Sequence, residues 1–230
     1  MAIAIIPARG GSKRIPHKNL KSFCGQPMIS YAVNSALESG CFSSVVVSTD
    51  DPQIAEVAQS LGADVPFLRD PTLADDFVGT TPVVIDTIQR LDRECQLRDK
   101  IYCCIYATTP LLDAKTLAKG LSLLTQSGAD YVFSAAEFPF PIQRALKRDQ
   151  QGFMRPFYPE YIGQRSQDLE PAFQDAGQFY WGTREAWLSG VGTFSGSGQA
   201  LILPRYRVVD IDTPEDWQLA ELLYQALHAQ

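Results

Sequence analysis

The residues best suited to chemistry lie in a glycine-rich basic loop that directly follows the first apolar run of the chain. That run, Ala2–Pro7, leads into the sequence Ala8-Arg9-Gly10-Gly11-Ser12-Lys13-Arg14-Ile15-Pro16-His17-Lys18-Asn19. Positions 9–21 hold five lysines or arginines and no acid, although the chain of 230 residues has a net charge of −6. Gly10 and Gly11 let the backbone approach a ligand closely and direct amides at it.

The charges of this loop suit a polyphosphate. Arg9, Lys13 and Lys18 would supply positive charge, and Ser12 would supply a hydroxyl group. The loop is not a Walker A motif, because the pattern G-x-x-x-x-G-K-[ST] is absent and Pro16 prevents an immediate helix. A solvated basic loop is the alternative, but five cations placed after a strand favour phosphate binding.

Two aspartates near the other end of the chain are candidate metal ligands. The alternation in Val208–Ile211 predicts a strand, and on a strand Asp210 and Asp212 share one face. Two carboxylates opposite a phosphate loop suit Mg²⁺ bridging a nucleoside triphosphate. In the alternative interpretation, Asp212 or Thr213 merely caps the last helix, which begins at Pro214.

Short apolar runs alternate with helical periods along the chain, which predicts right-handed βαβ units and a mainly parallel sheet covered on both faces. The predicted extended segments are Ala2–Pro7, Ser44–Ser48, Val65–Leu68, Ile101–Tyr106, Tyr131–Ala135, Gln178–Trp181, Ala200–Leu203 and Val208–Ile211. The predicted helices are Met28–Ser39, Pro52–Leu61, Pro82–Cys95, Lys115–Ser127 and Pro214–Ala229. Residues 138–175 break this pattern, and we interpret them as a projecting insertion with a hairpin of Gln143–Arg148 and Gly152–Arg155.

Composition excludes several classes of protein. The net charge of −6 argues against non-specific nucleic-acid binding. The longest apolar run, Ile101–Ala107, has seven residues and is too short for a bilayer span, so no membrane partner is expected. The five cysteines form no C-x-x-C pair, and the N-terminus is typical of a strand rather than a signal peptide. We therefore expect a protein of the reducing cytoplasm.

The order of the motifs resembles the acylneuraminate cytidylyltransferase family, which includes the CMP-sialic acid synthetases. The residues that carry the resemblance are Ile5–Asn19, Val46–Asp50, Phe67–Arg69 and Asp210–Thr213. Two further segments, Phe138–Arg144 and Gln174–Gly182, most resemble the pseudaminic acid cytidylyltransferases within that family. The resemblance implies a three-layer α/β fold of nucleotide-diphosphosugar-transferase type, with a mixed, mainly parallel sheet. Residues 1–230 would form a single nucleotidyltransferase domain.

The implied reaction converts CTP and a nonulosonic acid, here pseudaminic acid, to the CMP-sugar and pyrophosphate, with Mg²⁺ as cofactor. The sugar's anomeric hydroxyl would attack the α-phosphorus in line. Carried over position by position, the CTP-binding residues would be Ala8, Arg9, Gly10, Gly11, Ser12, Lys13, Lys18, Asn19, Arg69 and Thr80. Arg9, Lys13, Lys18 and Asp212 would be catalytic, and Asp210 and Asp212 would hold the metal ion. The sugar would contact Tyr106, Arg144, Arg165, Gln178 and Phe179.

One departure from the family bears on the sugar. Sialate synthetases usually carry Gln-Pro-Thr-Ser-Pro after the fourth strand, whereas this chain has Tyr106-Ala107-Thr108-Thr109-Pro110. Tyr106 therefore replaces a glutamine that touches sugar in those relatives, which favours a different nonulosonate over sialic acid itself. Ordinary packing at a strand end is the alternative role of Tyr106.

Several alternatives remain open at this point. The same reaction on N-acetylneuraminic, legionaminic or 3-deoxy-manno-octulosonic acid is the first, and a non-catalytic nucleotide-binding regulator is the second. A Rossmann dehydrogenase is disfavoured because G-x-G-x-x-G is absent after the first strand. The resemblance also implies a homodimer, in which aromatic residues of the insertion contact a second subunit rather than line the sugar pocket. These residues are Phe138, Phe140, Phe153, Phe157, Tyr158 and Tyr161.

Overall fold

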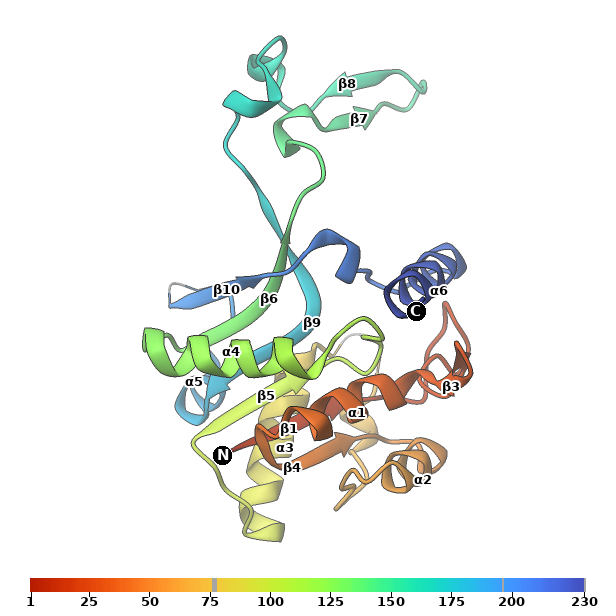
Figure 1. The fold of residues 1–230 in the computed structure, drawn as a ribbon, viewed down its shortest axis with the longest axis vertical. Helices are drawn as coiled ribbons and strands as arrows, with labels where there is room; N and C mark the ends of the chain where they lie inside the picture. Colours follow the sequence, from red (N-terminus) through yellow and green to blue (C-terminus); the bar gives the residue numbers. More distant parts are fainter. Residues whose placement is uncertain (76–77, 196, 230) are drawn as a thin grey trace.

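A mixed six-stranded sheet with the strand order β10-β6-β9-β5-β1-β4 forms the centre of the protein (Figure 1). The computed structural model describes residues 1–75, 78–195 and 197–229. The strands are β1 (Ala2–Pro7), β4 (Phe42–Ser48), β5 (Ile101–Ile105), β6 (Tyr131–Glu137), β9 (Phe173–Thr183) and β10 (Gly198–Ile202). The β9 strand runs antiparallel to its neighbours β5 and β6, and the other pairs are parallel. The expected mixed, mainly parallel sheet is confirmed.

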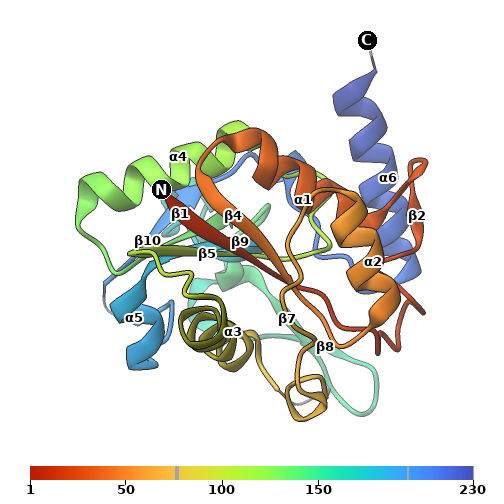
Figure 2. The same cartoon turned by 90° about the horizontal axis from the view of Figure 1, so that it is seen from below.

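Helices cover both faces of the sheet, as expected. They are α1 (Met28–Ser39), α2 (Pro52–Ser60), α3 (Thr80–Cys95), α4 (Ala114–Ser127), α5 (Arg184–Ser189) and α6 (Pro214–His228). Figure 2 shows α1 and α4 on one side of the sheet and α3 and α5 on the other. None of the helices in the described part of the chain has both the length and the apolar character of a membrane span.

The helix ends follow from local chemistry. The Asp51 carboxylate accepts a hydrogen bond from the amide of Gln53 at the start of α2, and Asp113 caps α4 in the same way. Gly40 and Gly128 end α1 and α4 in the left-handed conformation, which costs a glycine little. These residues explain why the predicted helix ends lie within two residues of the observed ones.

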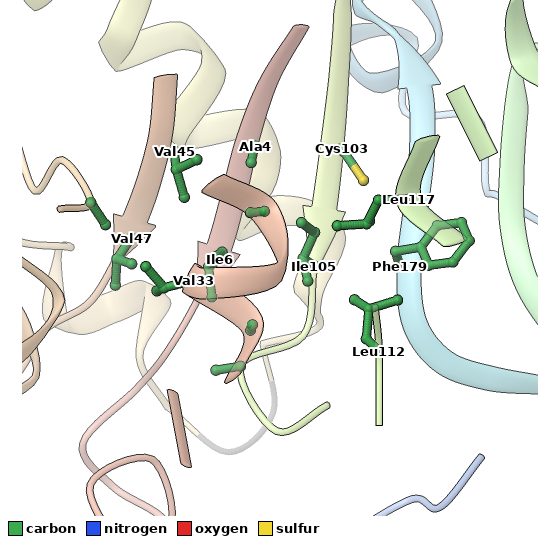
Figure 3. Close-up of a cluster of buried hydrophobic side chains, with 14 of the residues drawn as sticks. Ala4, Ile6, Val33, Val45, Val47, Cys103, Ile105, Leu112, Leu117 and Phe179 are labelled. Atoms are coloured by element: carbon green, nitrogen blue, oxygen red, sulfur yellow. The ribbon is translucent and has the colours of Figure 1, made fainter. Parts of the chain in front are cut away.

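Alternating side chains of the central strands divide the core into two layers. Ala4 and Ile6 of β1 point towards α1 and α4, whereas Ile3 and Ile5 pack towards α3 and α5. Figure 3 shows the first layer, in which Val33 of α1 lies among the strand residues. The neighbouring Cys103 and Cys104 likewise fall in opposite layers, as their adjacency on a strand predicts.

A third apolar cluster lies at the edge of the molecule and involves both ends of the chain. Ile15, from the loop after β1, and Phe23, from the short strand β2 (Ser22–Phe23), pack against Trp217 of α6. Ile211, just before α6, also belongs to this cluster. The β2 strand pairs with β3 (Gln26–Pro27), which leads directly into α1. The cluster therefore fixes the glycine-rich basic loop relative to the segment that precedes α6.

The insertion projects away from the sheet as an arm (Figure 1). The chain leaves at the end of β6 and returns along β9, which is 11 residues long. At the tip, β7 (Leu146–Arg148) and β8 (Met154–Pro156) form the antiparallel hairpin that the sequence predicts. The predicted strand Gln178–Trp181 is only the inner part of β9, because the outer part pairs with β6 at the base of the arm.

Two predicted extended segments are not strands, and this corrects the sequence-based expectation. Val208–Ile211 pairs with no strand in the described residues and instead crosses to α6 as irregular chain. Its polar groups bond elsewhere, since the Ile211 carbonyl accepts from Lys18 and the Asp212 amide donates to Asp216. Val65–Leu68 is irregular too, and a single bridge between Val46 and Asp64 precedes it. Asp210 and Asp212 therefore do not share the face of a strand.

Packing of α4 against β9 provides a test of the fold. A Cβ atom at Gly120 would lie 2.7 Å from Trp181 Cδ1 and 2.9 Å from Phe179 Cε2. We expect Gly120→Ala to lower the free energy of unfolding by about 1–3 kcal/mol, because overpacking outweighs the gain in helix propensity. Urea denaturation measures this difference. Gly192→Ala is the control, since a Cβ there meets nothing within 4 Å. Equal stability of the two variants would contradict the α4–β9 packing.

Candidate active site

A cavity of about 670 Å³ lies at the carboxyl ends of the central strands, where open α/β sheets bind ligands. Its volume is in the range of small-molecule sites. Of the residues predicted from sequence, those that line it are Arg9, Ser12, Lys13, Lys18, Asn19, Arg69, Thr80, Tyr106, Asp210 and Asp212. Sequence reasoning did not assign the other lining residues, which are Pro7, Arg14, Leu73, Asp75, Val78, Gly79, Val83, Ala107 and Thr108.

The loop after β1 is held in one shape by its own contacts. The Asn19 Nδ2 atom donates to the Arg9 carbonyl at 3.0 Å, and the Gly10 amide donates to Asp50 Oδ1 at 3.1 Å. A Cβ atom at Gly10 would lie 2.7 Å from Asp51 Oδ2, so the close approach to Asp51 requires glycine. The Gly10 amide thus points at a carboxylate, contrary to the expectation that it faces a ligand. The described lining of the cavity does not include Ala8, Gly10 or Gly11.

Three cations are already oriented around the cavity. Arg9 Nη1 donates to the Asp75 carbonyl at 2.7 Å, and Lys18 Nζ donates to the Ile211 carbonyl at 2.6 Å. Arg69 is only 5% exposed and donates to the hydroxyl and carbonyl oxygens of Ser48 at the end of β4. Burial lowers the pKa of the Arg69 guanidinium. A buried guanidinium gains from an anionic partner, so these cations suit a polyphosphate.

The N-terminus of α3 adds a further positive end to the cavity. Gly79 is the N-cap residue and provides no side chain to bond the first amides of the helix. These amides and the helix dipole favour an anion at this position. Thr80 also donates its hydroxyl to the Tyr106 hydroxyl oxygen at 3.2 Å, which joins α3 to the chain after β5. The Gly-Thr-Thr-Pro sequence at 79–82 is the signal that could have identified Gly79 as a site residue.

The two aspartates lie in the cavity beside cations. Asp212 Oδ2 lies 2.8 Å from Arg14 Nη1, and Asp212 Oδ1 lies 3.5 Å from Lys18 Nζ. Burial and the negative charge of Asp212 raise the pKa of the Asp210 carboxyl. Within the described residues, no cluster of three or more His, Cys, Asp or Glu side chains could hold a metal ion. Two carboxylates in a cation-lined cavity nevertheless fit Mg²⁺, which takes one or two protein carboxylates and completes its shell with phosphate and water.

Only Tyr106 of the predicted sugar-binding residues lines the cavity in the described structure. Gln178 and Phe179 are buried in β9, where the side-chain Nε2 atom of Gln178 donates to the Arg207 carbonyl. Arg165 lies on the arm, and its Nε is 2.7 Å from Asp168 Oδ2. Arg144, also on the arm, donates to the Gln164 carbonyl. The single chain does not bring these four residues to the cavity, and their roles in sugar binding stay predictions.

A mixed sheet with a cation-lined cavity at the carboxyl ends of its strands is the arrangement of an α/β enzyme that binds phosphate-bearing ligands. The family model described as cytidylyltransferase matches residues 3–147, and the chain belongs to this family. The resemblance seen in the sequence, and with it the assignment as a nucleotidyltransferase, is confirmed.

Relatives extend the match to nearly the whole chain. The chain is 44% identical to pseudaminic acid cytidylyltransferase of Campylobacter jejuni subsp. jejuni, over 98% of this chain and 97% of that protein. It is 32% identical to CMP-N,N'-diacetyllegionaminic acid synthase of Legionella pneumophila subsp. pneumophila, over 97% and 96%. In fold it is similar to CMP:2-keto-3-deoxy-manno-octonic acid synthetase complexed with CTP, with a TM-score of 0.70, 16% identity, and coverage of 98% and 99%. The expected fold class is thereby confirmed.

The raised pKa of Asp210 predicts that this residue destabilises the fold at neutral pH. Its folded pKa lies above its unfolded value, so the ionised carboxylate is less favourable in the folded protein, and this cost disappears as the pH falls below the unfolded pKa. We therefore expect Asp210→Asn to raise the Tm at neutral pH and to lose this advantage as the pH falls towards about 4. Thermal denaturation across this pH range measures the effect.

Asp216 is the matched comparison for this experiment. Hydrogen bonds from Thr213 lower the pKa of Asp216, which therefore stabilises the fold above its unfolded pKa. Asp216→Asn should lower the Tm at neutral pH, opposite in sign to Asp210→Asn. Shifts of the same sign in both variants would contradict the electrostatic description of this segment.

Proposed function

We propose that the protein is a CTP:pseudaminate cytidylyltransferase, which converts CTP and pseudaminic acid to CMP-pseudaminic acid and pyrophosphate. The observation that carries this proposal is the full-length similarity to a pseudaminic acid cytidylyltransferase in a chain whose strand ends form a cationic cavity. The same reaction on a legionaminic or another nonulosonic acid is the second candidate, because a legionaminate synthase is also similar over nearly the full chain.

The chain's own cations would bind and neutralise the triphosphate. Arg9, Lys13, Lys18 and the buried Arg69 line the same cavity, and Gly79 and Thr80 at the α3 N-terminus line it too. Transfer of a nucleotidyl group depends mainly on positioning and on neutralising the phosphate oxygens. The anomeric hydroxyl of the sugar would attack the α-phosphorus in line, and pyrophosphate would leave into the basic loop.

Mg²⁺ is the proposed cofactor, and Asp210 and Asp212 are the residues that would hold it. Bound there, the ion would supply positive charge next to the phosphate oxygens, as in other phosphoryl-type transfers. Support comes from the chemistry of the donors, since both are carboxylates and both line the same cavity as the loop cations. Asp212 Oδ1 also lies 3.5 Å from Lys18 Nζ, one of the cations that would bind the phosphates.

Tyr106 is the proposed contact to the sugar from within the cavity. Its hydroxyl accepts a hydrogen bond from Thr80, and its ring centroid lies 5.3 Å from that of Tyr180. These contacts hold the phenol at the end of β5, where it can select the sugar by shape and hydrogen bonding. The other proposed sugar-binding residues are Arg144, Arg165, Gln178 and Phe179. In a homodimer, Arg144 and Arg165 would contact the sugar bound to the second subunit.

A cytoplasmic homodimer is the proposed working form. The arm exposes many large apolar side chains, and exposed apolar surface of this kind marks a protein interface. They are Phe140, Ile142, Leu146, Phe153, Met154, Phe157, Tyr158 and Ile162. All five cysteines are free thiols in the structure, which supports a reducing compartment.

Pyrophosphate release with CTP and Mg²⁺ tests the proposed reaction. Pseudaminic, legionaminic and N-acetylneuraminic acids are compared in parallel, with and without CTP. We expect release with pseudaminic acid at the highest kcat/KM. A higher kcat/KM with legionaminic acid would keep the reaction and replace the sugar. An absence of release with every acid would instead favour the non-catalytic regulator.

Substitution of Asp212 tests the assignment of the metal ligand. We expect Asp212→Asn to abolish Mg²⁺-dependent turnover, by about a thousandfold or more if the ligand is essential, while thermal denaturation shows an intact fold. Asp113→Asn is the control, because Asp113 pairs with Arg207 at 2.8 Å and caps α4 outside the cavity. Turnover of Asp212→Asn equal to that of the control would remove Asp212 from the metal site.

A further inference from the structure

The contact between Arg14 and Asp212 involves a residue that the proposed mechanism does not use. Arg14 lies in the basic loop and lines the cavity, and its Nη1 atom is 2.8 Å from Asp212 Oδ2. The other carboxylate oxygen, Oδ1, faces Lys18 Nζ at 3.5 Å. Both oxygens of this proposed metal ligand are therefore next to a cation from the same loop.

The two cations are held very differently. Lys18 has a side chain that is 18% exposed and is anchored by a 2.6 Å hydrogen bond to the Ile211 carbonyl. The Arg14 side chain is 68% exposed. Exposed ion pairs contribute about 0.2–1 kcal/mol, so the contact of Arg14 with Asp212 is easily exchanged. Lys18 is thus a fixed part of the site, whereas Arg14 is a replaceable partner.

The carboxylates around Asp212 need positive charge. Asp210 and Asp216 both lie within four residues of Asp212, so three carboxylates lie close together in the sequence. A divalent cation that approaches Asp212 Oδ2 on the side where Arg14 binds would compete with the guanidinium for the same lone pair and repel its like charge. A metal ion bound on that side would therefore displace Arg14.

We propose that Arg14 is a positioning residue that holds Asp212 Oδ2 in the free enzyme and competes with the divalent cation for this oxygen. The displaced guanidinium remains in the cavity beside Arg9 and Lys13, where the phosphates of a nucleotide offer it a new partner. The ion pair of Arg14 and Asp212 thereby weakens metal binding in the absence of nucleotide and favours binding of the metal ion together with the nucleotide. This inference rests on the proposed function, because it takes Asp212 as a metal ligand.

Binding of Mn²⁺ to the metal-stripped, full-length protein without nucleotide tests this role of Arg14. Electron paramagnetic resonance measures free Mn²⁺ during the titration. Because Arg14→Gln removes an exposed, competing ion pair, we expect this variant to bind Mn²⁺ about two- to fivefold more tightly than wild type. Arg14→Lys keeps the charge and should remain closer to wild type. Unchanged or weaker Mn²⁺ binding by Arg14→Gln would overturn the proposal.

Two controls separate direct competition from the general effect of a lost charge. Lys21→Gln removes one positive charge from the same loop, but the Lys21 ammonium lies 4.4 Å from the centre of the Trp217 ring. It should change Mn²⁺ affinity less than Arg14→Gln, and an equal gain would show that only the loop charge matters. In an Asp212→Asn background the gain from Arg14→Gln should vanish, and its persistence would place the Mn²⁺ elsewhere and overturn the proposal.

The titration and the pyrophosphate assay fail independently of each other. A gain in Mn²⁺ affinity that depends on Asp212 supports the role of Arg14 even if no nonulosonic acid releases pyrophosphate, in which case only the reaction is wrong. Release of pyrophosphate by wild type together with no gain in Arg14→Gln would keep the reaction and reject the role of Arg14.

Discussion

The ammonium group of Lys18 joins the two parts of the chain that build the cavity. Its Nζ donates to the Ile211 carbonyl at 2.6 Å across a separation of 193 residues, and it also lies near Asp212. The basic loop carries several cations and no acid, and the segment at the start of α6 carries clustered carboxylates. Like charges within each segment disfavour each other's ionised forms, so each segment is more stable when it lies next to the other.

Apolar packing beside this contact fixes its geometry. Partly exposed ion pairs contribute about 1 kcal/mol at most, whereas burial of one large apolar side chain contributes about 1.5–3 kcal/mol. Ile15 and Phe23, which lie on either side of Lys18 in the sequence, form a cluster with Trp217 of α6, and Ile211 belongs to the same cluster. The cluster therefore determines where the loop and the segment before α6 meet, and the charges determine which ligands their meeting point can bind.

Local signals in the sequence predict most elements, because helix caps and apolar periods are short-range. Asp51 and Gly40 mark helix ends from neighbouring residues alone. The antiparallel direction of β9 was not predictable in this way, since it depends on pairing with β5 and β6 far along the chain. The alternation in Val208–Ile211 predicts a strand wrongly, because its carbonyl and amide groups find partners in Lys18 and Asp216. In the site, the sequence composition showed the cations, but the pairing of two of them, Arg14 and Lys18, with Asp212 depends on folding.

Five cations and three carboxylates line the described part of the cavity before any ligand enters, so part of its positive charge is already offset. Arg14 already pairs with Asp212, so in the proposed reaction phosphate oxygens would replace this carboxylate as the partner of Arg14. A metal ion likewise replaces cations as the partner of the carboxylates. The charge of Asp210 is poorly compensated in the free protein, because burial and Asp212 raise the pKa of its carboxyl. A cation bound beside it would recover that lost stability, so ligand binding and folding are coupled at this residue.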